Sequence, residues 1–90
     1  MTRKPSALLL KPDGSKAIAR PKGKKFDHKE LQKLIGGYFQ ILPSSKPHFL
    51  LVVDDDGRAK GLEPNLAASQ LYTGARQIVG CALHVPRELL

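Results

Sequence analysis

Apolar residues follow a helical period in the middle of the first half of the chain and form strand-like runs on either side of it. Leu31, Leu34 and Ile35 have the i, i+3 and i+4 spacing that buries one face of a helix. Residues 49–53, Phe-Leu-Leu-Val-Val, form a short continuous apolar run, which is typical of a strand buried on both faces. The helical pattern stops at Gly36-Gly37 and resumes as a strand, so this junction organises the predicted fold.

The residues that flank the helical pattern predict both ends of the helix. Asp27 is suited to cap the N-terminus, and Glu30 stands where it completes a capping box with Asp27. Phe26 and Leu31 are spaced as the two halves of a hydrophobic staple. We expect the helix to end at Gly36-Gly37, because glycine takes the left-handed conformation of a C-terminal cap without strain.

A hairpin is predicted before the helix. Its arms are residues 7–11 and 16–20, and the intervening Pro12-Asp13-Gly14-Ser15 has the residue types of a tight turn. The second arm alternates polar and apolar side chains imperfectly, and we expect Ile18 on this arm to face the core.

The remainder of the chain is predicted to extend the sheet and to add a short helix. The expected elements are strands at 38–42 and 49–53, a short pairing strand at 58–62, a helix capped by Asn65, and a last strand at 77–85. The order ββαββ(β)αβ predicts an α+β fold, with a largely antiparallel sheet of about five strands and with one main and one short helix packed on one side. The order is also that of a β-grasp fold.

Size and composition indicate one folded domain. The chain has 90 residues, of which 41% are hydrophobic and 26% charged, as in ordinary globular domains. We expect a single domain over residues 1–90, with frayed ends at 1–5 and 86–90. Cys81 is the only cysteine, so no intramolecular disulfide can form and a cytoplasmic location is expected. No apolar run has the length of a signal-peptide core or a membrane span.

The net charge of +7 is concentrated at the N-terminal end. Residues 1–29 hold nine Lys or Arg against two Asp, whereas residues 30–90 carry equal numbers of basic and acidic side chains. This asymmetry favours an anionic partner. The candidate partner- or anion-binding residues are Arg20, Lys22, Lys24, Lys25 and Lys29. Three interpretations stay open for them: a solvated basic face, a contact to an anion or nucleic acid, and a docking surface for an acidic protein.

No group of residues has the spacing of a metal site. Asp54-Asp55-Asp56-Gly57 offers oxygen ligands, but a calcium loop needs a glutamate at its twelfth position, where Asn65 stands. A polar hairpin turn is therefore the preferred interpretation. His28 and His48 share no metal-ligand spacing and are expected at the surface. We expect no metal and no cofactor.

No group of residues has the pattern of a catalytic site either. Cys81 and His84 lie three residues apart on a predicted strand, so their side chains point to opposite faces, with Cys81 at a core position. Gly36-Gly37 ends a helix, whereas a phosphate-binding loop precedes one. We therefore predict no catalytic residues and a protein that is not an enzyme.

Several short segments resemble one known family. They are 31–40, 52–57, 61–65, 67–68 and 78–80. Together they are similar to the DUF3846 family of small proteins, found largely in bacteriophages, plasmids and bacteria. The most specific parts are the Gly-Gly-aromatic junction and the Gly-Leu-x-x-Asn segment. Two positions differ from the family pattern: Gln40, where members often carry Glu, and Cys81, where Asp or Asn often follows the glycine. The resemblance implies an accessory protein of a phage or mobile element, and it transfers no catalytic residue.

These observations favour a small, non-enzymatic binding protein in the cytosol of a bacterial host. Its basic surface is expected to engage an acidic host protein and to modulate or block it. The alternative is a protein that binds nucleic acid or a small nucleotide signal through the same basic residues. We expect no membrane partner, and a monomer or small homo-oligomer, for which the apolar pair Leu89-Leu90 is a candidate contact.

Overall fold

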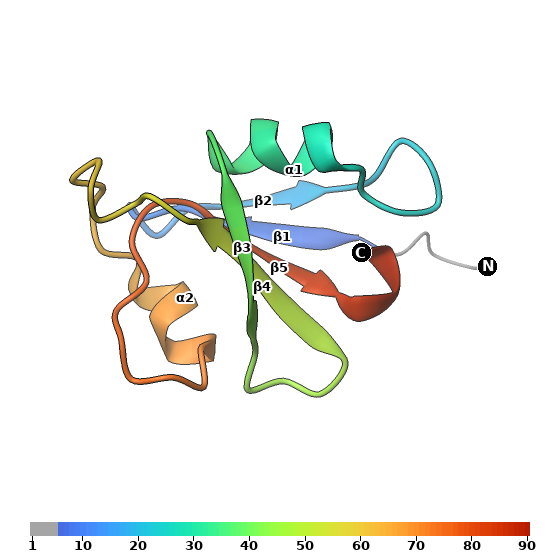
Figure 1. Ribbon diagram of the computed structural model, residues 1–90. Helices are drawn as coiled ribbons and strands as arrows, with labels where there is room; N and C mark the ends of the chain where they lie inside the picture. The colour runs from blue at the N-terminus through green and yellow to red at the C-terminus, as the bar shows by residue number, and fades with distance from the viewer. Residues whose placement is uncertain (1–5) are drawn as a thin grey trace.

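A computed structural model describes residues 6–90 of the chain. It contains one five-stranded antiparallel sheet and two α-helices, which confirms the predicted α+β class and element order (Figure 1). The elements are β1 (Ala7–Leu10), β2 (Lys16–Ala19), α1 (His28–Ile35), β3 (Phe39–Pro43), β4 (Phe49–Asp54), α2 (Leu66–Leu71), β5 (Ala82–Pro86) and a 3-10 helix, η1 (Arg87–Leu89). No helix within these residues is long and apolar enough to cross a membrane.

The last strand occupies the centre of the sheet. The strand order is β2-β1-β5-β4-β3, so β5 lies between the β1-β2 hairpin and the β3-β4 hairpin. It pairs antiparallel with both neighbours, with Leu83 opposite Leu9 on one side and opposite Val52 on the other. The two hairpins are therefore joined through β5 and not directly to each other.

Helix α1 has the two ends that its sequence predicts. The Glu30 N–H donates to Asp27 Oδ1 (2.7 Å), and Glu30 Oε1 accepts from the Asp27 N–H (3.1 Å), which completes the capping box. Gly36 ends the helix with φ = 95°, a left-handed conformation that favours glycine. Leu31 and Ile35 are buried, so the predicted apolar face of the helix packs on the sheet.

The two helices cover opposite faces of the sheet, and the expectation that they share one side was wrong. Val52 and Leu83 lie in the core cluster with α1, whereas Leu51 lies in a second cluster that includes Ala68 of α2. The reason is the run of successive apolar residues in β4, which presents apolar side chains to both faces and needs cover on each. Figure 1 shows α1 above the sheet and α2 below it at one end.

Three other elements differ from the prediction. Ile18 does not face the core but is 63% exposed, because it points to the face that the short α2 does not reach. Residues 58–62 form successive turns and not a strand, and Gly61 adopts φ = 70° there. The last strand begins at Ala82, five residues later than expected from the apolar pattern; Val79 makes only an isolated bridge, to Pro64.

The C-terminal residues are held in the core, in place of the frayed end expected at 86–90. Leu89 is 2% exposed and belongs to the cluster beneath α1. Its carbonyl accepts a hydrogen bond from the Phe26 N–H (2.8 Å), which ties the chain end to the start of α1. Leu89 is therefore used within the fold and is not a free contact for a dimer. The other expected frayed end, 1–5, lies outside the described residues.

Candidate functional site

An open groove of about 660 Å³ runs between the edge strand β2 and helix α1. Its apolar lining comes from β1, β2, α1 and the loop before α1, and its charged lining comes from that loop and from the exposed face of the helix. We call it the basic groove; its apolar lining is Leu9, Ala19, Phe26 and Leu34, with Ile18 at the β2 edge, its basic lining is Arg20, Lys22, Lys29 and Lys33, and its acidic lining is Asp27 and Glu30.

The structure brings three of the five predicted residues to the groove. Arg20, Lys22 and Lys29 line it, whereas Lys24 and Lys25 lie exposed in the preceding loop and do not line it. The sequence analysis missed Lys33. Lys33 could have been predicted from its spacing of four residues from Lys29, because this spacing places both lysines on the same face of α1.

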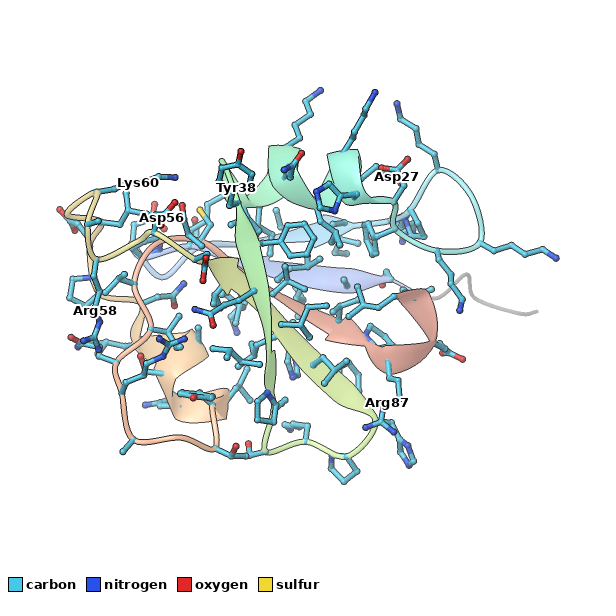
Figure 2. All side chains as sticks on the ribbon, in the orientation of Figure 1. Asp27, Tyr38, Asp56, Arg58, Lys60 and Arg87 are labelled. Atoms are coloured by element: carbon cyan, nitrogen blue, oxygen red, sulfur yellow. The ribbon has the colours of Figure 1, made fainter. Side chains whose placement is uncertain are left out.

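Glu30 holds the basic loop against the helix. Its Oε2 accepts from the Lys22 N–H (3.0 Å), while its Oε1 accepts from the Asp27 N–H (3.1 Å). Both carboxylate oxygens thus bind backbone donors, and the loop is fixed at Lys22. Figure 2 shows Asp27 at the start of α1, with long nitrogen-tipped side chains of the loop and helix projecting outward.

The cations of the groove are not neutralised by salt bridges. Within residues 6–90, the one ion pair is between Lys60 and Asp54. Neither of these residues lines the groove. The basic side chains of the groove are therefore available to an external anion. The groove also borders β2, which pairs only with β1, so the other edge of β2 has backbone groups without sheet partners.

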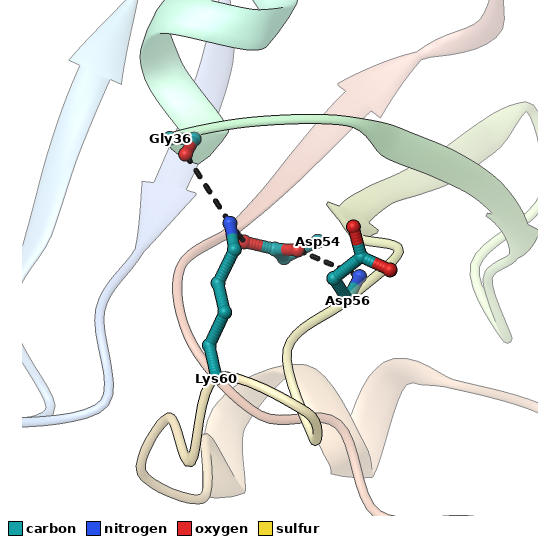
Figure 3. Close-up of polar contacts among 4 residues, drawn as sticks. All are labelled: Gly36, Asp54, Asp56 and Lys60. Carbon is teal, nitrogen blue, oxygen red and sulfur yellow. Dashed lines mark hydrogen bonds and ion pairs between the residues drawn. The ribbon is translucent and has the colours of Figure 1, made fainter.

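The aspartate run at the end of β4 forms a structural network and not a cation loop (Figure 3). The Asp54 side chain is 1% exposed; its Oδ2 lies 2.8 Å from Lys60 Nζ, and its Oδ1 accepts from the Asp56 N–H (2.8 Å). Lys60 Nζ also donates to the Gly36 carbonyl (3.3 Å), at the C-terminal end of α1. A Cβ at Gly37 would lie 2.7 Å from Lys60 Nζ, so the second glycine leaves room for this lysine. Among the described residues no group of three or more His, Cys, Asp or Glu could hold a metal ion.

Asn65 joins three parts of the fold through a fully buried side chain. Its Oδ1 accepts from the Ala68 N–H (3.1 Å), as expected for a helix cap. Its Nδ2 also donates to the carbonyls of Leu10 (2.9 Å) and Gly80 (2.8 Å). The sequence predicted the cap but not these two bonds, because neither partner is near Asn65 in the chain.

His84 and Cys81 lie on opposite faces of the sheet. Cys81 packs partly buried against the cluster beneath α1, whereas the His84 ring faces the α2 side. His84 Nε2 is 2.9 Å from Ser44 Oγ, and the ring stacks on Phe49 with a centroid distance of 4.6 Å. The other two histidines, His28 and His48, are exposed.

The stability of the protein is expected to fall on mild acidification because of His84. Burial, and to a smaller extent the Lys46 charge, lower the pKa of His84 below its ordinary value of 6.5. The unfolded chain therefore binds a proton at a higher pH than the folded chain. The contribution of neutral His84 to the free energy of unfolding is fully present above about pH 6.5. It is lost as the pH falls through the folded-state pKa of His84.

Urea unfolding at two pH values, one above and one below the ordinary histidine pKa, measures this loss. The free energy of unfolding should decrease more in the wild type than in His84→Gln, which keeps a polar side chain but does not titrate. An equal decrease in both proteins would show that other groups cause the pH dependence.

Comparison with known protein families shows which family the chain belongs to. The pattern of a domain of unknown function, DUF3846, matches residues 4–87, which is nearly the whole chain. The chain belongs to the DUF3846 family. A search of curated proteins and a search of solved structures each found no match. In this DUF3846 protein, the matched residues include Gly36-Gly37 and Asn65, whose contacts hold the fold together.

Proposed function

We propose that this DUF3846 protein is a non-enzymatic binding protein of a phage or mobile element, in which the basic groove takes up an acidic segment of a host protein. Occupation of that segment would modulate or block the host protein. The observation that supports this proposal is the excess of basic over acidic side chains around a partly apolar groove: four basic residues against Asp27 and Glu30, with none of the four in a salt bridge within the described residues.

The groove suits an extended acidic segment. Such a segment can pair its backbone with the free edge of β2, as in β-strand addition. Alternate side chains then point toward the groove, where carboxylates meet Arg20 and the lysines of α1 and apolar residues meet Leu34. Charge complementarity of this kind raises the association rate and selects among partners.

The alternative partner, nucleic acid or a nucleotide signal, would use the same cations for phosphate groups. Phe26 is the one aromatic residue in the groove lining, and it is buried in the core. Base stacking on exposed aromatic rings supplies much of the affinity for single strands, and this groove offers none. The acidic segment is therefore the favoured partner.

Charge reversal in the groove is expected to weaken binding of an acidic peptide by at least about tenfold. The groove variant carries Lys22→Glu, Lys29→Glu and Lys33→Glu. A matched control carries Lys11→Glu, Arg58→Glu and Arg87→Glu, three exposed positions outside the groove, and has the same net charge. Fluorescence anisotropy of a labelled peptide with alternating Glu and Val measures the affinity of each protein at low and moderate salt.

The same titration separates the candidate partners. A peptide N-methylated along one edge should bind less tightly if it pairs with β2. Equal affinities of the groove variant and the control for the acidic peptide would exclude the basic groove as its binding site. Tighter binding of duplex DNA, RNA or a cyclic nucleotide than of the peptide, lost in the groove variant, would support the alternative. Affinity capture from bacterial lysate with wild-type protein and both variants then identifies a host partner.

A further inference from the structure

The face of the sheet opposite the basic groove carries a second, different concavity. Helix α2 covers only one end of this face, and beyond it Leu8 remains 38% exposed. A pocket of about 550 Å³ opens there between α2, β1, β5 and the β3–β4 loop. This volume lies within the range of about 300 to 1,000 Å³ that is usual for small-molecule sites. We call it the α2-side pocket.

The walls of the α2-side pocket are mainly apolar. Leu8 and Leu10 of β1 lie on one side, Leu71 of α2 on another, and Phe49 of β4 next to His84. An apolar ligand body placed among these side chains would be removed from water, which is the main source of affinity in such sites.

The polar groups of the pocket are cations and neutral donors. Lys16 enters from β2 and Lys46 from the β3–β4 loop, and neither forms a salt bridge within the described residues. Gln70 and the His84 ring complete the polar lining, and no Asp or Glu contributes to it. The charge of Lys46 lies close enough to act on His84, so one of the two cations stands near this ring. An anionic group would find attraction here and no acidic neighbour to repel it.

We infer that the α2-side pocket binds a small amphiphilic anion, a molecule with a compact apolar body and one carboxylate, sulfonate or phosphate group. The apolar body contacts Leu8, Leu71 and Phe49, and the anion lies between Lys16 and Lys46. Ser44 fixes the His84 ring through its 2.9 Å hydrogen bond, so the aromatic wall is formed before the ligand arrives. This site lies on the opposite face from the basic groove and does not depend on the function proposed for that groove.

A pair of related probes tests both halves of this inference. 8-Anilinonaphthalene-1-sulfonate carries an aromatic body and a sulfonate, and N-phenyl-1-naphthylamine has the same body without the charge. We expect one site for the sulfonate probe, with an affinity at least about tenfold above that of the neutral probe. Methyl and imidazole NMR signals locate the site, and those of Leu8, Leu71 and His84 should shift on binding.

Two charge-neutralising variants provide the matched comparison. Lys16→Gln/Lys46→Gln should lower the affinity for the sulfonate probe by about tenfold and leave the affinity for the neutral probe unchanged. Lys11→Gln/Arg58→Gln, at exposed positions outside both the pocket and the basic groove, loses the same charge and should bind the sulfonate probe like the wild type. Equal affinity of the two probes, equal effects of the two variants, or NMR shifts confined to residues outside the pocket would overturn the inference.

Discussion

Asn65→Asp is expected to destabilise the protein by about 4 kcal/mol or more, which is a large part of the roughly 5 to 13 kcal/mol typical of a domain of this size. The change retains the size of the side chain and an acceptor for the Ala68 N–H. It replaces the buried NH₂ group by an oxygen that faces the carbonyls of Leu10 and Gly80. Three oxygens, one of them charged, would then face one another in a site with no access to water.

The relative destabilisation by different substitutions at position 65 distinguishes loss of the two buried hydrogen bonds from simple loss of a helix cap. Aspartate and asparagine are similarly good caps, so a role in capping alone predicts little change for Asn65→Asp. We expect Asn65→Asp to be at least as destabilising as Asn65→Ala, which costs about 2 to 4 kcal/mol. Asp27→Asn, at the exposed cap of α1, is the control and should change the stability by less than about 0.5 kcal/mol. Urea denaturation measures all three; a tolerated aspartate at position 65 would contradict the hydrogen-bond geometry.

Lys60→Met is expected to cost about 2 to 3 kcal/mol of unfolding free energy. The change leaves the Asp54 carboxylate, which is 1% exposed, without its cation and with one backbone hydrogen bond from Asp56. It also removes the donor to the Gly36 carbonyl at the end of α1. Thermal or urea unfolding measures the loss.

A second substitution tests the cause. In Asp54→Asn/Lys60→Met the buried charge is absent, and the asparagine oxygen still accepts from the Asp56 N–H. The double variant should therefore be more stable than Lys60→Met alone, because a buried pair that is removed together costs less than a buried charge left unpaired. If the double variant is the less stable of the two, packing of the Lys60 side chain and not its charge accounts for the effect.

The predicted parts of the fold are those specified by residues near one another in the chain. The capping box of Asp27 and Glu30 and the left-handed Gly36 depend on contacts within α1, so the helix ends could be predicted. The side of the sheet that each helix covers depends on distant contacts, and Ile18 was wrongly assigned for that reason. The side chains of a strand alternate between the two faces of the sheet. The local sequence does not specify which of these faces a distant helix will cover.

The candidate sites show the same limit. The lysines of the loop before α1 were predicted from their clustering, and three of the five predicted basic residues line the groove. The hydrogen bond between Ser44 and His84 joins residues 40 positions apart, and the α2-side pocket is assembled from strands and a helix distributed over most of the chain. Neither has a local signature.

The position of β5 has a consequence for how the protein is made. During synthesis the β1-β2 and β3-β4 hairpins leave the ribosome first, and each lacks the neighbour that will occupy its inner edge. Only when residues 82–86 emerge can one strand join the two halves, across a large separation in sequence that slows folding. Until then the nascent chain exposes at once the two edges that β5 will pair, and such unpaired edges favour association between chains.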